Sequence, residues 1–116
     1  MKMNTNALVL QQTALFVQHD FEVEEAIPDD VTEAELLAFI AEQVRIWLDT
    51  DMEHLFYVLY RLDINELKVR QALSPSAIEM PSEAIAQLIF DREKQKATSR
   101  IQYRAQDETE GDGWNS

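Results

Sequence analysis

The residues best suited to recognising a partner form a basic line near the C-terminal end of the chain. It consists of cations at intervals of four residues, Arg92, Lys96, Arg100 and Arg104, with the aromatic Tyr103 among them. Residues four apart lie on the same side of an α-helix, so this spacing places the cations along one helix edge. The basic line is either an ordinary solvated helix face or a docking site for an acidic surface.

A second candidate is the acidic segment 20–35, which contains eight carboxylates and no basic residue. Its first six acids are Asp20, Glu22, Glu24, Glu25, Asp29 and Asp30. The segment offers a docking site for the basic line, within the chain or across a dimer, or for a basic partner protein. We do not expect calcium binding, because a calcium loop needs a glycine at its sharp turn and this segment has none.

The remaining residues give no support to catalytic or cofactor chemistry. Asp51 and His54 have the i, i+3 spacing of a shared metal site, but di-iron bundles need this motif twice. The other histidine, His19, has no acidic residue three positions before it. Cysteine is absent, and both glycines lie in the last residues of the chain, away from any phosphate-binding loop. We therefore expect no catalytic residue, no cofactor and no metal ion.

The composition predicts one globular domain with few turns. Of 116 residues, 46% are hydrophobic and 28% are charged, which is typical of globular proteins. Only 2 glycines and 3 prolines are present, which favours helices joined by short links over an all-β fold. The net charge of −12 opposes binding to nucleic acid and to anionic lipid. No apolar run has the length of a secretory leader or a membrane span, so we expect a cytoplasmic location.

The first half of the chain contains two predicted helices. Apolar residues over 7–21 favour one helix, although two short strands at 7–10 and 14–17 also fit the pattern. Thr32 and Glu35 form a capping box, in which each side chain satisfies the free backbone N–H of the other residue. The residues that follow have apolar groups at helical spacing, so a strongly amphipathic second helix is expected.

Two further helices are predicted in the centre of the chain. A second capping box, Thr50 with Glu53, predicts the start of a helix over 51–62 that is apolar nearly all round. Asp63 or Asn65 can cap the short fourth helix that follows.

The last predicted helix, over 82–104, changes character along one face. Ile85, Leu88 and Ile89 form an apolar stripe, and the same stripe continues into the basic line. The half over 91–104 therefore either projects into solvent or packs on an acidic surface.

These features predict an all-α fold, a compact bundle of four to five helices with an extended, basic C-terminal helix. Residues 1–106 form a single helical domain. Residues 107–116 are acidic and contain both glycines, which predicts a flexible, disordered tail.

Two aromatic residues lie at the edges of the central helices. Phe39 falls on the flank of the second predicted helix, and Tyr57 falls on the outer side of the third. They are either core-edge packing or part of a patch that binds a partner, because exposed aromatic residues are enriched at interfaces.

Two stretches, LYRLDINELKVRQAL and AIAQLIFDREKQKATSRIQY, carry a resemblance. Their sequence resembles a group of small bacterial proteins of unknown function. The resemblance implies an all-helical fold and a bacterial source. It implies no activity, substrate or site.

We expect a small, non-enzymatic cytoplasmic protein that interacts with or regulates a protein partner, or a second copy of itself in a homodimer. The alternative is an acidic inhibitor or immunity-type protein whose acidic segment blocks a basic surface on an enzyme or nucleic-acid-binding protein. We expect no nucleic acid, membrane or small-molecule substrate as partner. A metal- or carboxylate-dependent enzyme is a third class, supported only by chance pairs among the many acids.

Overall fold

The computed structural model describes the backbone of residues 5–114 and the side chains of residues 5–104, and this part of the chain folds into five helices without a strand. In chain order they are α1 (Thr5–Asp20), α2 (Glu33–Thr50), α3 (Met52–Arg61), α4 (Glu66–Ala72) and α5 (Pro81–Trp114). The predicted all-α bundle is confirmed. The first segment is one helix, so the alternative of a hairpin over 7–17 is wrong.

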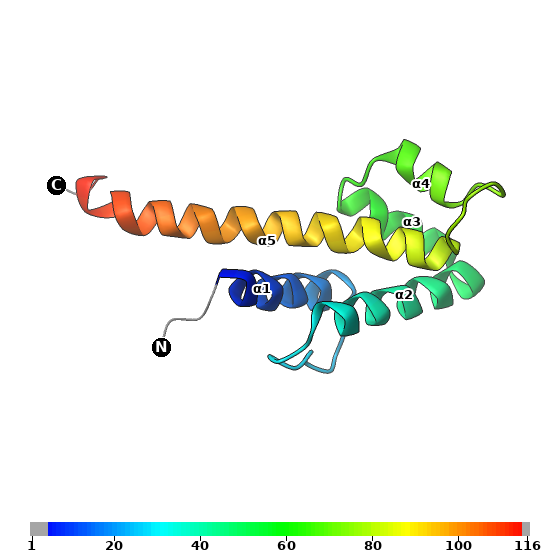
Figure 1. The fold of residues 1–116 in the computed structure, drawn as a ribbon, viewed down its shortest axis with the longest axis horizontal. Coiled ribbons are helices and arrows are strands. Elements are labelled where there is room, and N and C mark those ends of the chain that lie inside the picture. The colour runs from blue at the N-terminus through cyan, green and yellow to red at the C-terminus, as the bar shows by residue number, and fades with distance from the viewer. Residues whose placement is uncertain (1–4, 115–116) are drawn as a thin grey trace.

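Helix α5 is the longest helix of the bundle, and the other helices are arranged along it (Figure 1). Helices α1 and α2 lie along one side of α5 and make their largest contacts with it. Helix α3 packs mainly against α2, and the short α4 packs against the N-terminal half of α5. The C-terminal part of α5 extends past the other helices, which gives the molecule extents of 57 × 28 × 26 Å.

The core is one continuous apolar cluster to which every helix contributes. Its members with no exposed surface are Val17, Leu36, Ile40, Val44, Leu55, Ile85 and Ile89. The three on α2 recur every four residues, so they share the face that packs on the neighbouring helices. Burying one such aliphatic side chain contributes about 1.5–3 kcal/mol to folding.

Two of the predicted helix starts are confirmed. The hydroxyl of Thr32 accepts a hydrogen bond from the backbone N–H of Glu35 (3.1 Å), and the carboxylate of Glu35 accepts one from the N–H of Thr32 (3.0 Å). Asn65 caps α4, because its Oδ1 accepts hydrogen bonds from the N–H groups of Leu67 (2.9 Å) and Lys68 (3.2 Å).

The predicted capping box of Thr50 with Glu53 is wrong. Thr50 is the last residue of α2, and its hydroxyl donates to the carbonyl of Ile46 at 2.7 Å. Asp51 caps α3 instead, with its carboxylate accepting a hydrogen bond from the N–H of His54 at 3.1 Å. The two helices are therefore joined at a single residue, and the side chain at that residue is the one that can reach the free N–H groups of α3.

After α1 and after α3, a residue other than glycine adopts a backbone conformation that usually favours glycine. Glu22 follows α1 with φ of 55°, and Asp63 follows α3 with φ of 56°. Both lie in the left-handed region that usually favours glycine at a helix end. The N–H of Val23 then reaches back to the carbonyl of Gln18 at 2.9 Å, which closes the end of α1.

Helix α5 is longer than the sequence pattern predicted. Its helical backbone continues to Trp114, so the predicted end near Arg104 is wrong. The residues that immediately follow Arg104 include alanine, glutamine and glutamate, which are good helix formers. Side chains 105–116 lie outside the described part of the structure, so the mobility of the acidic tail over 107–116 stays a prediction.

Around Glu93 and Lys96, α5 packs against α1, and only its later turns extend past the other helices. Its buried stripe runs from Ile89 through Glu93 to Ala97, each with no exposed surface. The sequence analysis expected the apolar stripe to continue through Arg92 and Lys96. The buried positions are instead the next residues along the chain, Glu93 and Ala97, and the side chains of Arg92 and Lys96 are half-buried beside them. The surface that α1 presents is mostly apolar, with Val17 and Ala14 among its buried residues.

Candidate functional site

A buried carboxyl group, Glu93, lies where α5 meets the end of α1. The ammonium of Lys96 donates to Glu93 Oε1 at 2.9 Å and to Asp20 Oδ2 at 3.2 Å. Asp20 is the last residue of α1, so Lys96 bridges carboxyl groups from two helices. We call these three residues the Asp20 cluster. Their side chains are 17% (Asp20), 0% (Glu93) and 31% (Lys96) exposed.

The two carboxyl groups of the Asp20 cluster titrate in opposite directions. Burial and, to a lesser extent, hydrogen bonding with Asp20 raise the pKa of Glu93 to about 8, against the opposing effect of Lys96. Burial also acts to raise the pKa of Asp20, but hydrogen bonds with Glu93, His19 and Lys96 outweigh it and leave that pKa lowered. At neutral pH, Glu93 therefore carries a proton and Asp20 is ionised.

The hydrogen bonds around the carboxyl group of Glu93 also favour its protonated form. Oε1 accepts the bond from Lys96, whereas no group of the described residues donates to the buried Oε2. An ionised carboxylate with a buried, unpaired oxygen is costly, while a protonated one can donate to the neighbouring Asp20 carboxylate.

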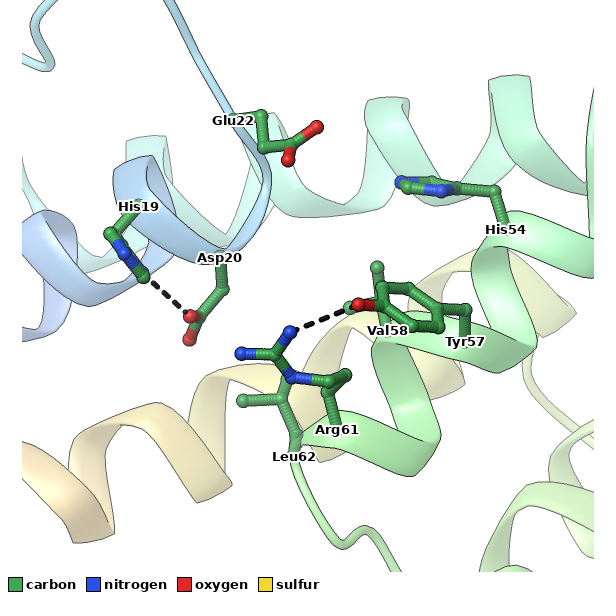
Figure 2. A pocket seen from close by; sticks show the side chains of 8 residues that line it. All are labelled: His19, Asp20, Glu22, His54, Tyr57, Val58, Arg61 and Leu62. Atoms are coloured by element: carbon green, nitrogen blue, oxygen red, sulfur yellow. Dashed lines mark hydrogen bonds and ion pairs between the residues drawn. The ribbon is translucent and has the colours of Figure 1, made fainter.

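Asp20 also forms one wall of a cavity of about 420 Å³ between the end of α1 and α3 (Figure 2). The cavity brings together both histidines of the chain, His19 and His54. His19 donates to Asp20 Oδ1 at 3.1 Å, and on the opposite side Arg61 donates to the hydroxyl of Tyr57 at 2.9 Å (Figure 2). No pattern in the sequence indicates that residues so far apart in the chain would share a cavity.

The cavity does not form a metal centre. Within the described part of the chain, no three histidine or carboxylate side chains are placed to hold one ion. His54 packs edge-on against Trp47 with ring centroids 4.8 Å apart, and its ring lies 6.0 Å from that of Tyr57. Asp51, the other half of the i, i+3 motif, is engaged in capping α3.

The first half of the predicted basic line is held within the fold. Arg92 Nε donates to the carbonyl of Leu62 at 2.8 Å, which ties α5 to the end of α3. Lys96 is engaged by the Asp20 cluster and also lies 4.8 Å from the ring centroid of Phe16 on α1. These two cations therefore have partners inside the molecule.

The second half of the basic line is exposed. The guanidinium of Arg100 lies 5.9 Å from the ring centroid of Phe16, and the side chains of Tyr103 and Arg104 face solvent. Whether these residues bind a partner stays a prediction.

The structure brings only one residue of the acidic segment to the basic line, namely Asp20. Glu22 lines the cavity beside it. The other predicted site residues of the segment, Glu24, Glu25, Asp29 and Asp30, are exposed on the connection between α1 and α2. Docking of the acidic segment on the basic line within the chain is thus limited to the Asp20–Lys96 contact.

An apolar groove with a volume of about 900 Å³ lies between α3 and α4. Its apolar lining residues are Phe56, Leu59, Tyr60, Ile64, Leu67, Val69 and Leu73, and we call it the α3–α4 groove. Three of these side chains are unusually open for their size, with exposed fractions of 42% for Phe56, 84% for Tyr60 and 62% for Leu67. Asp63 and Glu66 lie at its rim, and Arg70 is ion-paired with Glu66 at 3.3 Å.

The sequence prediction placed an aromatic patch elsewhere. Phe39 is 36% exposed on α2, and Tyr57 is 52% exposed and lines the cavity beside Arg61, and whether they bind a partner stays a prediction. The sequence does contain a signal for the groove, because Tyr60 and Leu67 are large apolar residues at helix positions that do not face the core. A signal for Glu93 existed in its spacing of four residues from both Ile89 and Ala97.

Comparison of the chain with protein-family models, curated proteins and solved structures gave no match. Among the described residues, no helix is both long enough and apolar enough to cross a membrane.

Proposed function

We propose that this chain is a non-enzymatic interaction protein that binds its partner in the α3–α4 groove. The exposure of Phe56, Tyr60 and Leu67 around one concave surface is the observation that supports the proposal. A contiguous exposed apolar surface with a polar rim is characteristic of interaction sites, and tyrosine is enriched among the residues that dominate binding energy.

The partner that fits this groove is a polypeptide segment with apolar anchors and basic flanking residues. The apolar lining provides a place for the anchors, and the exposed carboxylate of Asp63 attracts a flanking cation, whereas Glu66 is already paired with Arg70. The chain as a whole has a net charge of −12, which steers basic partners toward it and repels a second copy. We therefore favour a different, basic protein over a homodimer.

The cytoplasm is the compartment that we propose for this interaction. The chain has no cysteine, whereas small secreted domains of this size commonly depend on disulfide bonds.

Binding to synthetic peptides tests the proposed function. The probe is a short peptide with leucines at helical spacing and flanking lysines, and its matched control has glutamates in place of the lysines. We expect calorimetry to detect the lysine peptide only. The variant Tyr60→Ser should weaken binding at least about tenfold, because hot-spot residues dominate interface energy. Tyr103→Ser, which removes an aromatic residue that is 69% exposed but lies outside the groove, should leave binding unchanged.

Equal binding of both peptides, or equal loss in the Tyr60→Ser and Tyr103→Ser variants, would overturn the proposal. The first result would show that charge plays no part, and the second would show that the groove is not the site.

A second candidate function, an acidic inhibitor of a basic surface, is favoured by the connection between α1 and α2. The carboxylates of Glu24, Glu25, Asp29 and Asp30 are exposed and pair with no cation among residues 5–104. The variant Glu24→Lys, Glu25→Lys distinguishes the two functions. It should abolish salt-sensitive binding if these acids are the site, and should change groove binding only slightly if they are not.

A further inference from the structure

The Asp20 cluster joins the end of α1 to α5 through groups that hold one proton between them. We propose that it is a proton-binding latch, in which a proton shared by Glu93 and Asp20 fixes α1 on α5 and loss of that proton loosens α1. This inference is independent of the α3–α4 groove, since none of the three residues lines it.

The geometry of the Asp20 cluster makes its balance of charge depend on a single proton. Two carboxyl groups meet a single ammonium, with Lys96 2.9 Å from Glu93 and 3.2 Å from Asp20. With the proton present, the cluster contains one anion and one cation, and the buried charges balance. Without it, two anions share one cation, and the additional charge falls on Glu93, which has no exposed surface and an Oε2 with no donor.

The charged groups that act on Glu93 come from α1 and α5, and α3 adds a cation that acts on Asp20. Asp20 faces it from α1, with His19 hydrogen-bonded to Asp20 from the outer side. Lys96 faces it from α5 itself. Arg61 of α3 interacts electrostatically with Asp20 but is primarily hydrogen-bonded to Tyr57, which raises the pKa of Arg61.

The other two helices bring no charge to the cluster. The buried residues of α2 are Leu36, Ile40, Val44 and Trp47, and those of α4 are Val69 and Ala72. The cation available to compensate an ionised Glu93 is therefore Lys96, which Asp20 already engages.

Helix α1 is the element that such a latch would release. It packs mainly against α5 and only marginally against α2, so its position depends on the α1–α5 interface to which the Asp20 cluster belongs. The ammonium of Lys96 also lies over the ring of Phe16 on α1, which adds a second contact that depends on the position of Lys96.

The direction of the pH effect follows from the protonation of Glu93. Its pKa is about 8 when α1 is docked, against 4.5 for the free side chain. Docking therefore takes up one proton between these values. The ratio of docked to released α1 should fall about tenfold per pH unit from about pH 4.5 to about pH 8, and then level off.

Hydrogen exchange of the α1 amides in the full chain tests the latch. After correction for the intrinsic exchange rate, protection of α1 in the wild type should fall about tenfold per pH unit across this window, and more steeply than protection of α2. The variant Glu93→Gln mimics the protonated carboxyl group, so its α1 protection should stay flat. Glu79→Gln, which changes the charge equally at an exposed loop position, should behave as the wild type does.

Two results would overturn the latch. One is the same pH dependence in Glu93→Gln as in the wild type, and the other is a parallel loss of protection in α1 and α2, which would indicate global unfolding. If Glu93→Gln does not fold, Asp20→Asn provides the second test. Removing Asp20 lowers the affinity of the docked Glu93 for its proton, so the fall in protection should level off at a lower pH than in the wild type. An unchanged profile in Asp20→Asn would contradict the proposal.

Discussion

Lys96 of α5 and Asp20 of α1 form an ion pair of 3.2 Å across a separation of 76 residues in the chain. Among residues 5–104, it is the one ion pair that joins two helices, since the others lie within four residues of each other in sequence. Exposed pairs of that local kind contribute little to stability. The Asp20–Lys96 pair is partly buried and coupled to Glu93, so its loss has a larger effect.

Replacing Lys96 by methionine should destabilise the fold by about 1–3 kcal/mol, because the ionised Asp20 loses its cation and the buried Oε1 of Glu93 loses its hydrogen-bond donor. Urea unfolding at neutral pH measures the effect. The matched control is Lys94→Met, which removes the same charge from an exposed position on α5 and should change stability by less than about 0.5 kcal/mol. Equal effects of the two substitutions would show that the cluster adds nothing beyond net charge.

Acid should weaken the fold through Asp20. Its pKa is lowered in the folded protein, against 3.8 for the free side chain, so its contribution is present above that value and is lost as the pH falls through the folded pKa. As the pH falls below about 3.8, where Glu93 is already protonated, Asp20→Asn should therefore lose less stability than the wild type. Thermal unfolding followed by circular dichroism measures this difference, and identical acid profiles would contradict it.

Substitution of Asp51, which caps α3, should reduce the free energy of unfolding more than substitution of Thr50 does. The variant Asp51→Ala should cost about 1 kcal/mol, because the N–H of His54 loses its acceptor. Thr50→Ala should cost less, since the Thr50 hydroxyl only donates to a carbonyl of its own helix. The free energy of unfolding of each variant decides between the two residues, and a larger cost at Thr50 would restore the capping box that the sequence predicted.

Local signals in the sequence were sufficient for most of the helices. Thr32, Glu35 and the apolar spacing after them define α2 without reference to the rest of the chain, and the structure has these features where they were predicted. The error at Thr50 arose because Asp51, the neighbouring residue, is an equally good cap. Choosing between adjacent caps depends on how α2 and α3 cross, which is a tertiary property.

The sites depended on tertiary contacts and were harder to predict. Glu93 is not among the predicted site residues, and glutamate is almost never fully buried without a partner. Its burial depends on Asp20, which lies in the first helix of the chain. The α3–α4 groove likewise depends on the turn after α3, where Asp63 has a positive φ and directs α4 back past Tyr60. Neither relationship appears in the periodicity of a single helix.

Chemical-shift mapping by NMR is the most direct test of the central claim, that the α3–α4 groove binds an apolar, basic segment. Titration with the lysine-flanked peptide should shift the amide signals of residues that line the groove, among them Tyr60, Ile64 and Leu67, and leave those of the connection between α1 and α2 unchanged. Shifts confined to Glu24, Glu25, Asp29 and Asp30 would contradict the claim and favour the acidic inhibitor. The absence of any shift with the lysine-flanked peptide would also contradict it.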